Sequence, residues 1–276
     1  MMKIKKDRIV LYICVALVIL WAGFPLYWMF ITSIKPDKEI VTWPPSIITL
    51  TPTLKHIYNA LFHTQFFAFL RNSLVATLSS IALVLFVASL GGYSLARFNF
   101  PGKSIFANSI LMTYMFPPVV LAIPFHIIFR FLGLNDSLLG LTITYTSISL
   151  PFSLWLLWAY FQTVPIQIEE SALIDGASRL RTLFSIVFPT ALPGIIATSI
   201  FTFVTAYNDY LFARIIISSE SLKTLPLGIM DVYEAVVTDW GLLMALSLVS
   251  VLPALAFFVA IQRFLIRGWG MGAIKG

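Results

Sequence analysis

The sequence has 276 residues, of which 59% are hydrophobic and only 11% are charged, whereas about a quarter of a soluble globular protein is charged. Its mean hydropathy is +0.93. This composition excludes an ordinary soluble enzyme, a disordered protein and a coiled coil. The single cysteine excludes a disulfide scaffold and a cysteine-rich metal site. The net charge of +6 is small and unevenly placed, so we expect no nucleic-acid partner.

Six stretches longer than 20 residues carry no Asp, Glu, Lys or Arg, and a membrane-spanning helix needs about 20 apolar residues. These charge-free windows are Ile9–Ile34, Asn72–Ala96, Ser104–Phe129, Ser137–Ile168, Thr182–Asn208 and Trp240–Gln262. They predict an all-α, polytopic membrane protein with a single transmembrane domain over residues 1–276. The expected spans are about 9–34, 71–96, 104–130, 138–163, 190–212 and 241–264. The window His56–Leu70 is too short to span, and we interpret it as an interfacial or extracytoplasmic helix.

The placement of the basic residues predicts the orientation. If the N-terminus is cytoplasmic, the inner segments hold 11 of the 18 Lys and Arg residues. Cytoplasmic loops of membrane proteins carry an excess of Lys and Arg. We therefore expect both termini in the cytoplasm and an uncleaved first span, since no small-residue cleavage site follows the N-terminal apolar run.

Prolines interrupt several of the expected spans. Pro117, Pro118 and Pro124 all fall in the third span. Proline removes a backbone donor and kinks a helix, and the freed carbonyls need protein or water partners within a membrane. We expect the third span to be broken and to face other helices. Proline is also commoner in membrane helices generally, so the kinks alone do not prove a pathway.

The inner loop between the fourth and fifth spans, residues 165–189, carries the most informative pattern. Pro165 suits a helix start, and Glu169 and Glu170 lie in the early turns, where the helix dipole favours acids. Gly176 is expected to interrupt this helix, and Ser178 to cap a second, amphipathic one. Such a short helix could dock into a groove on a soluble partner or lie on lipid; its acids disfavour an anionic lipid surface.

This loop resembles the signature of permease subunits of binding-protein-dependent ABC importers, which reads E-A-A, three residues, G, nine residues, I-x-L-P. Here Glu170-Ser171-Ala172 precedes Gly176 at that spacing, and the motif closes at Ile186 and at Phe188-Pro189. Ser171 replaces Ala and Phe188 replaces Leu. The spacing is kept throughout.

Other segments resemble the MalG-like subunits of the sugar importer branch, from the first span to the last residue. The similar segments are Asn72-Ser73 at the second span, the stretch from Thr205 to Phe212, Thr224-Leu225-Pro226-Leu227-Gly228 and the C-terminal Gly272-Ala273-Ile274-Lys275-Gly276. The resemblance implies a type I ABC importer permease fold in the cytoplasmic membrane of a prokaryote. It also implies a MalF-like second permease subunit, two copies of an ATP-hydrolysing subunit and an extracytoplasmic sugar-binding protein.

The resemblance assigns roles to three segments. The coupling helix that docks on the ATPase comprises Glu169, Glu170, Ser171, Ala172, Leu173, Ile174, Asp175, Gly176 and Ala177. The tail Ala273, Ile274, Lys275 and Gly276 is expected to enter the ATPase interface. The outer loop Leu222–Asp239 is expected to reach the binding protein. The sequence has no G-x-x-x-x-G-K-[ST] loop, so we expect ATP hydrolysis in a separate subunit and no cofactor in this chain.

Polar residues at two places in the spans are candidates for a functional role. Tyr207, Asn208 and Asp209 lie at the outer end of the fifth span, where a carboxylate could line the pathway and bind sugar hydroxyls. We favour an interfacial role for Asp209, with Arg214 as a possible partner. His126, near the outer end of the third span, is interpreted as a structural residue rather than a proton relay.

The overall prediction is therefore a transport subunit and not an enzyme. The resemblance to the sugar importer branch implies that the importer carries a carbohydrate, and specifically an oligosaccharide. A stand-alone secondary transporter or channel is the alternative, but it would need ionisable residues at the membrane midplane, and the spans are nearly free of them. An intramembrane enzyme is disfavoured because the spans hold no paired acids and no Ser/His dyad.

Overall fold

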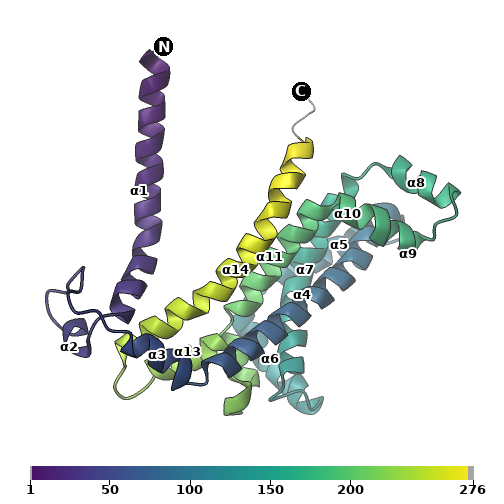
Figure 1. Cartoon of the computed structure of the whole chain (residues 1–276). Coiled ribbons are helices and arrows are strands. Elements are labelled where there is room, and N and C mark those ends of the chain that lie inside the picture. The colour runs from purple at the N-terminus through teal and green to yellow at the C-terminus, as the bar shows by residue number, and fades with distance from the viewer. Residues whose placement is uncertain (1, 273–276) are drawn as a thin grey trace. The chain divides into compact units, whose positions relative to one another are not determined.

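The computed structural model describes the backbone of residues 2–272, and every regular element in that range is helical (Figure 1). Side chains are described at residue 8, over 10–262 and at 264. The long helices are α1 (Met2–Ser33), α4 (Phe66–Arg97), α7 (Leu138–Gln162) and α14 (Trp240–Gly272). The shorter ones are α2 (Asp37–Ile40), α3 (Lys55–Phe62), α5 (Lys103–Tyr114), α6 (Pro118–Phe131), α8 (Ile166–Ile174), α9 (Arg179–Thr182), α10 (Phe188–Thr190), α11 (Leu192–Tyr207), α12 (Leu211–Ile216) and α13 (Leu225–Tyr233). A π-helical turn, η1, covers Leu183–Val187, and a 3₁₀ turn, η2, covers Glu220–Leu222.

Four of the described helices are long and apolar enough to cross a membrane: α1 over Val10–Ser33, α4, α7, and α14 over Trp240–Gln262. Two bent pairs pass the same length and composition test when each is taken as one span. They are α5 with α6, bent by 98°, and the run Arg179–Thr190 with α11, bent by 83°. The described residues therefore hold four to six candidate spans, which agrees with a polytopic all-α protein.

The expected break in the third charge-free window is confirmed. α5 ends at Tyr114 and α6 begins at Pro118, because Pro117 and Pro118 cannot donate backbone hydrogen bonds to the preceding turn. Pro151 and Pro253, in contrast, lie inside the continuous helices α7 and α14. A single proline thus does not end α7 or α14, whereas the adjacent Pro117 and Pro118 separate α5 from α6.

Helix α4 extends beyond its charge-free window at the N-terminal end. It begins at Phe66, whose N–H is 3.2 Å from the Thr64 hydroxyl, and it passes through the exposed Arg71. A long basic side chain can keep its charged head in water while its stem covers apolar surface. A charge near a helix end therefore limits the apolar window without ending the helix.

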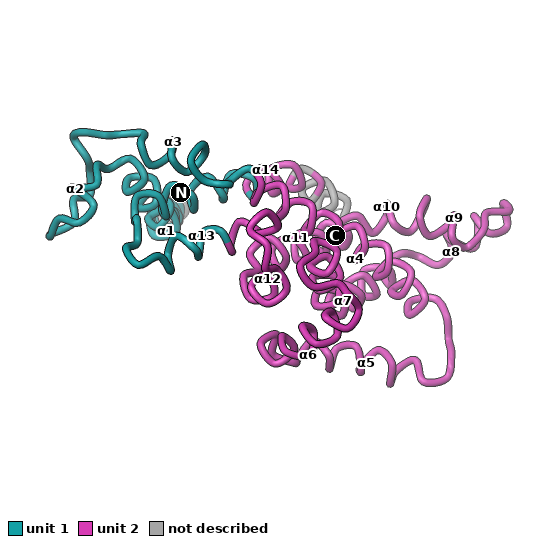
Figure 2. The backbone as a smooth tube through the Cα atoms, turned by 90° about the horizontal axis from the view of Figure 1, so that it is seen from below, with its two compact units in different colours: residues 1–67, 228–254 teal, residues 68–227, 255–276 magenta. Residues whose placement is uncertain are grey.

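The chain divides into two compact units, which Figure 2 colours separately. Unit 1 holds residues 1–67 and 228–254, and unit 2 holds residues 68–227 and 255–276. In unit 1, the buried His56 has its Nε2 atom 3.1 Å from Asp37 and its Nδ1 atom 3.8 Å from Asp239. Lys55 lies 2.6 Å from the same Asp37, and this hydrogen bond lowers the pKa of that carboxyl.

Unit 2 contains the packed helical core around α4, α7 and α11. One buried cluster is centred on Leu157, Phe161 and Leu183, and a second cluster on Leu141 and Tyr145. Small residues let the helices approach closely. A Cβ atom added at Gly92 would lie 3.0 Å from the backbone nitrogen of Trp158, and one added at Gly194 would lie 2.4 Å from the ring of Tyr160.

Candidate functional site

The expected interruption of the inner-loop helix at Gly176 is present. α8 ends at Ile174, and Gly176 adopts a left-handed backbone conformation with φ of 85°. Its N–H donates to the Leu173 carbonyl at 3.1 Å, and the N–H of Ala177 donates to the Ala172 carbonyl at 2.9 Å. This pair of bonds is a Schellman motif, which satisfies the last carbonyls of a helix and favours glycine at that position.

A second helical segment follows the Gly176 turn and leads into α11. The Ser178 hydroxyl accepts from the N–H of Arg181 at 3.3 Å, so the expected N-cap is confirmed. α9, η1 and α10 then run as far as Thr190, and α11 begins at Leu192 after a bend of 83°. The inner loop is therefore a helix, a glycine turn and a bent helix.

A buried ion pair joins α8 to the end of α4. Arg97 Nη2 lies 2.5 Å from Glu169 Oε1, and Arg97 Nε donates to the same oxygen at 2.7 Å. Tyr93 donates its hydroxyl to Glu169 Oε2 at 3.0 Å, and Arg97 also donates to the Val164 carbonyl at 2.8 Å. The side chains of Arg97 and Glu169 are only 7% and 2% exposed. Sequence reasoning placed Glu169 in the docking set and did not anticipate this inward role.

The remaining residues of the predicted docking set face outward to a greater extent. Exposed members are Glu170, Ser171, Ile174, Asp175 and Gly176, and half-buried members are Ala172, Leu173 and Ala177. Ile174 is 86% exposed. Two neighbouring glutamates thus differ in position, because consecutive helical residues point about 100° apart.

Asp209 is engaged by protein groups at the start of α12. It accepts from the N–H groups of Phe212 at 3.3 Å and Ala213 at 3.0 Å, and from the Tyr145 hydroxyl at 3.1 Å. These bonds make it a cap for α12 and a link to α7. The exposed Asn208 donates to the carbonyl four residues earlier in its own helix, at 3.0 Å.

Tyr207 is buried and stacks on Phe203, with ring centroids 5.0 Å apart. His126 has its Nδ1 atom 3.1 Å from the Ile215 carbonyl, which gives it a structural partner. The described residues contain no group of three or more His, Cys, Asp or Glu side chains able to hold a metal ion. The four tail residues Ala273, Ile274, Lys275 and Gly276 lie outside the described residues.

The segment before α13 is held by the Asn-Ser pair near the start of α4. Asn72 donates to the carbonyls of Ser221 at 2.8 Å and Lys223 at 3.0 Å. Ser73 accepts from the N–H of Leu225 at 2.8 Å. Asn72 and Ser73 are buried, so their contribution is to position the first residues of the loop that the sequence placed on the outer side.

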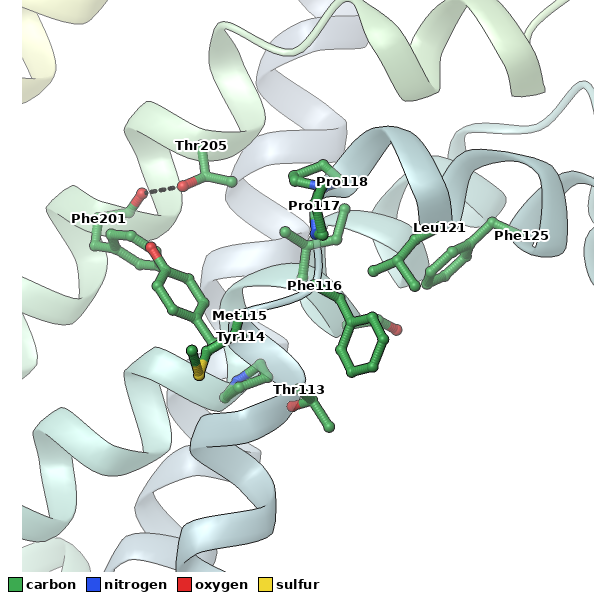
Figure 3. A pocket seen from close by; sticks show the side chains of 13 residues that line it. Thr113, Tyr114, Met115, Phe116, Pro117, Pro118, Leu121, Phe125, Phe201 and Thr205 are labelled. Atoms are coloured by element: carbon green, nitrogen blue, oxygen red, sulfur yellow. Dashed lines mark hydrogen bonds between the residues drawn. The ribbon is translucent and has the colours of Figure 1, made fainter.

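A cavity of about 400 Å³ opens at the break between α5 and α6 (Figure 3). Phe201 and Thr205 of α11 lie on one side, and Leu121 and Phe125 of α6 lie on the other. The remaining lining residues come from the end of α5, the break, the start of α6 and α7: Thr113, Tyr114, Met115, Phe116, Pro117, Pro118, Ser147, Ile148 and Pro151. Sequence reasoning expected the break, but it assigned no cavity residue, because the four helices that line the cavity meet only in the fold.

Comparisons with known proteins agree with this architecture. Residues 88–270 match the family model described as "Binding-protein-dependent transport system inner membrane component". The inner membrane ABC transporter permease protein YcjP of Escherichia coli is 37% identical, covering 98% of this chain and 97% of that protein. The diacetylchitobiose uptake system permease protein DasC of Streptomyces coelicolor is 33% identical, covering 95% and 96%.

A more distant relative and a solved structure extend the comparison. The trehalose/maltose transport system permease protein MalG of Thermococcus litoralis is 30% identical, covering 98% of this chain and 97% of that protein. A chain of a bacterial ABC transporter involved in the import of the acidic polysaccharide alginate matches with a TM-score of 0.82 at 20% identity. That match covers 94% of this chain and 96% of the other, and it establishes the similarity of fold.

Proposed function

The chain belongs to the family of binding-protein-dependent transport system inner membrane components, and we propose that it is the permease subunit of an ATP-driven importer for an oligosaccharide. It is a multi-pass protein of a prokaryotic cytoplasmic membrane. The carbohydrate assignment is supported by two relatives named for diacetylchitobiose and for trehalose or maltose. The MalG-like motifs of the sequence support the same assignment.

The proposed topology has six spans in one transmembrane domain, with both termini in the cytoplasm. The two bent helix pairs count as one span each in this topology. The excess of Lys and Arg on the side of the termini supports the orientation. This arrangement puts α8 at the cytoplasmic face and the segment Leu222–Asp239 at the outer face, where a binding protein would meet it.

The observation that carries the proposal is the construction of the inner loop. α8 ends in a glycine turn, presents an exposed surface that includes Glu170 and Ile174, and is held to α4 by the buried Arg97–Glu169 pair. A short helix that is exposed on one side and anchored on the other is suited to receive a push from a partner. We infer that this helix docks on a separate ATP-hydrolysing subunit, and that the tail Ala273–Gly276 contributes to the same interface.

The proposed transporter contains three further kinds of protein besides this chain. They are a MalF-like second permease, two copies of the ATPase and an extracytoplasmic sugar-binding protein. Since this chain has no phosphate-binding loop, the energy for transport would come from the ATPase. No step of catalysis is assigned to this chain.

The proposal is tested by replacing Gly176 with valine in the importer reconstituted in vesicles. A β-branched residue is strongly disfavoured at a φ of 85°, so the α8 turn should change shape. We expect ATP-dependent sugar uptake to fall at least tenfold and the ATPase to bind less tightly. Gly133→Val is the matched control, because Gly133 has a φ of 67° and, as at Gly176, an added Cβ would meet nothing within 4 Å.

The control variant should keep most of the uptake, since its strain falls in a different turn. Equal loss of uptake in both variants would contradict a special role of the α8 turn. Uptake by this chain alone, without any ATPase, would instead favour the stand-alone transporter or channel.

A further inference from the structure

The cavity at the α5–α6 break lies where the backbone cannot face lipid. Pro117 and Pro118 have no N–H, so the carbonyls of Thr113 and Tyr114 lose the donors that an unbroken helix would supply. The Thr113 carbonyl instead accepts from Phe116 at 3.3 Å, in a shorter turn. Non-helical backbone at membrane depth is tolerated only where it is buried in protein or lines a water-filled space. The break therefore favours a polar pathway beside it.

Aromatic rings form one wall of this cavity. Tyr114 and Phe201 both line it, with ring centroids 6.2 Å apart. Phe152 packs against both rings, 5.6 Å from Tyr114 and 4.4 Å from Phe201, and it is not itself a lining residue. Phe152 thus supports two rings that reach the cavity from different helices, and supported rings are suitable platforms for the C–H face of a pyranose.

Three hydroxyl groups supply hydrogen-bond acceptors along the same cavity. Thr113 donates its own proton to the Ile110 carbonyl at 2.6 Å, and Ser147 donates to the Ile143 carbonyl at 2.8 Å. Thr205 donates to the Phe201 carbonyl at 2.9 Å, the bond drawn in Figure 3. Because each proton is used within its helix, the oxygen lone pairs remain to accept from a ligand.

The lack of charge in the cavity lining favours neutral carbohydrates over anionic ones. All 13 lining residues are uncharged: they are aromatic or aliphatic, proline, methionine, or hydroxyl-bearing. A carboxylate or phosphate on a ligand would lose hydration here without gaining a cationic partner. The volume of about 400 Å³ lies in the range of small-ligand pockets, about 300–1,000 Å³.

We propose that this cavity is a transmembrane subsite for a neutral saccharide, which stacks on Tyr114 and Phe201 and donates hydroxyl protons to Thr113, Ser147 and Thr205. The inference rests on the proposed function and deepens it, because it gives this chain its own contact with the transported sugar. It also states a selectivity: neutral saccharides should bind and uronic or phosphorylated ones should not.

The experiment places a reporter thiol in the cavity of the reconstituted importer. Cys14, the only cysteine, is exposed in α1 and is first replaced by serine. Ser147→Cys then introduces a near-isosteric thiol at an exposed lining position, and Ser218→Cys, exposed and outside the lining, is the matched control. Alkylation rates are measured in ATP-energised vesicles with binding protein and diacetylchitobiose, trehalose or maltose, using whichever sugar is taken up.

The transported neutral sugar is expected to slow alkylation of the thiol in the Ser147→Cys variant at least fivefold and to leave the Ser218→Cys variant unchanged. Adding Phe201→Ala should abolish the protection and raise the KM for uptake, whereas Phe131→Ala, at an exposed position of α6 outside the lining, should do neither.

Two failures are distinguishable. ATP-dependent uptake without protection, or protection that survives Phe201→Ala, would overturn the subsite and leave the importer role intact. Failure of all three sugars to enter in an ATP-dependent manner would overturn the assignment to these neutral sugars, and the subsite with it. Equal protection by a digalacturonate would overturn the proposed selectivity for neutral saccharides.

Discussion

Replacing Glu169 by glutamine should detach α8 from α4. The glutamate oxygens receive two contacts from Arg97, at 2.5 and 2.7 Å, and one from Tyr93, at 3.0 Å, in a site where both charged side chains are less than a tenth exposed. Removing one partner of a buried ion pair costs about 3–5 kcal/mol, because the other charge stays buried and unpaired. Glutamine keeps one acceptor oxygen, so the low end, about 3 kcal/mol, is expected. This corresponds to roughly a hundredfold shift toward the detached form of α8, at about 1.4 kcal/mol per factor of ten.

Amide hydrogen exchange of α8 in the assembled importer measures this shift directly. Glu169→Gln should speed exchange over Ile166–Ile174 by up to about a hundredfold, because the helix opens locally more often. Glu170→Gln is the matched control: it removes the same charge from the adjacent, exposed residue. Exchange in that variant should stay close to the wild-type rate.

A double variant separates the ion pair from general disruption. Arg97→Gln together with Glu169→Gln leaves no unpaired buried charge, so its cost should be clearly smaller than the sum of the two single costs. Additive costs, or equal exchange in the Glu169→Gln and Glu170→Gln variants, would refute the reasoning.

Two further predictions concern the buried His56 and the turn that holds Asp136. Gly241→Ala would place a Cβ 2.3–2.4 Å from the buried His56 ring. Such overpacking costs about 1–3 kcal/mol, so the melting temperature should fall. Gly23→Ala, with nothing within 4 Å in the helix α1, should not lower it. Hydrogen bonds from the Ser219 hydroxyl and from nearby backbone N–H groups lower the pKa of Asp136 below its ordinary value of 3.8. Its stabilising contribution is therefore complete above pH 3.8 and is lost as the pH falls through the lowered pKa. Asp136→Asn should remove this acid-sensitive step from a stability-against-pH curve, and an unchanged curve would contradict it.

The helical architecture was readable from the sequence because charge is costly in a membrane. The charge-free windows located the long helices, and the adjacent Pro117 and Pro118 located the break between α5 and α6. The windows did not give helix ends, as α4 begins before Arg71. A helix can continue through a flexible basic side chain at the membrane interface. Hydropathy therefore gives the length of the apolar stretch and not the length of the hydrogen-bonded helix.

The sequence predicted the turn and the helix cap of the inner loop, but not the ion pair that holds the loop to α4. Gly176 and Ser178 act locally, and their roles follow from the few residues beside them. The Arg97–Glu169 pair joins residues 72 positions apart, and no periodicity brings them together. A weak signal existed: Glu169 shares a helix face with the half-buried Ala172 and Leu173.

The inner loop and the cavity are connected through the end of α4 and helix α5. Arg97, which ends α4, is held by Glu169 of α8, and α5 starts only six residues later, at Lys103. The other end of α5 is the break that lines the cavity. Because the Arg97–Glu169 contact is buried and multiply bonded, we expect a displacement of α8 to move the end of α4 and, through the short turn of residues 98–102, the start of α5. In the proposed importer, a displacement of α8 by the ATPase would therefore reach the cavity through the contacts of Arg97 with Glu169 and Val164.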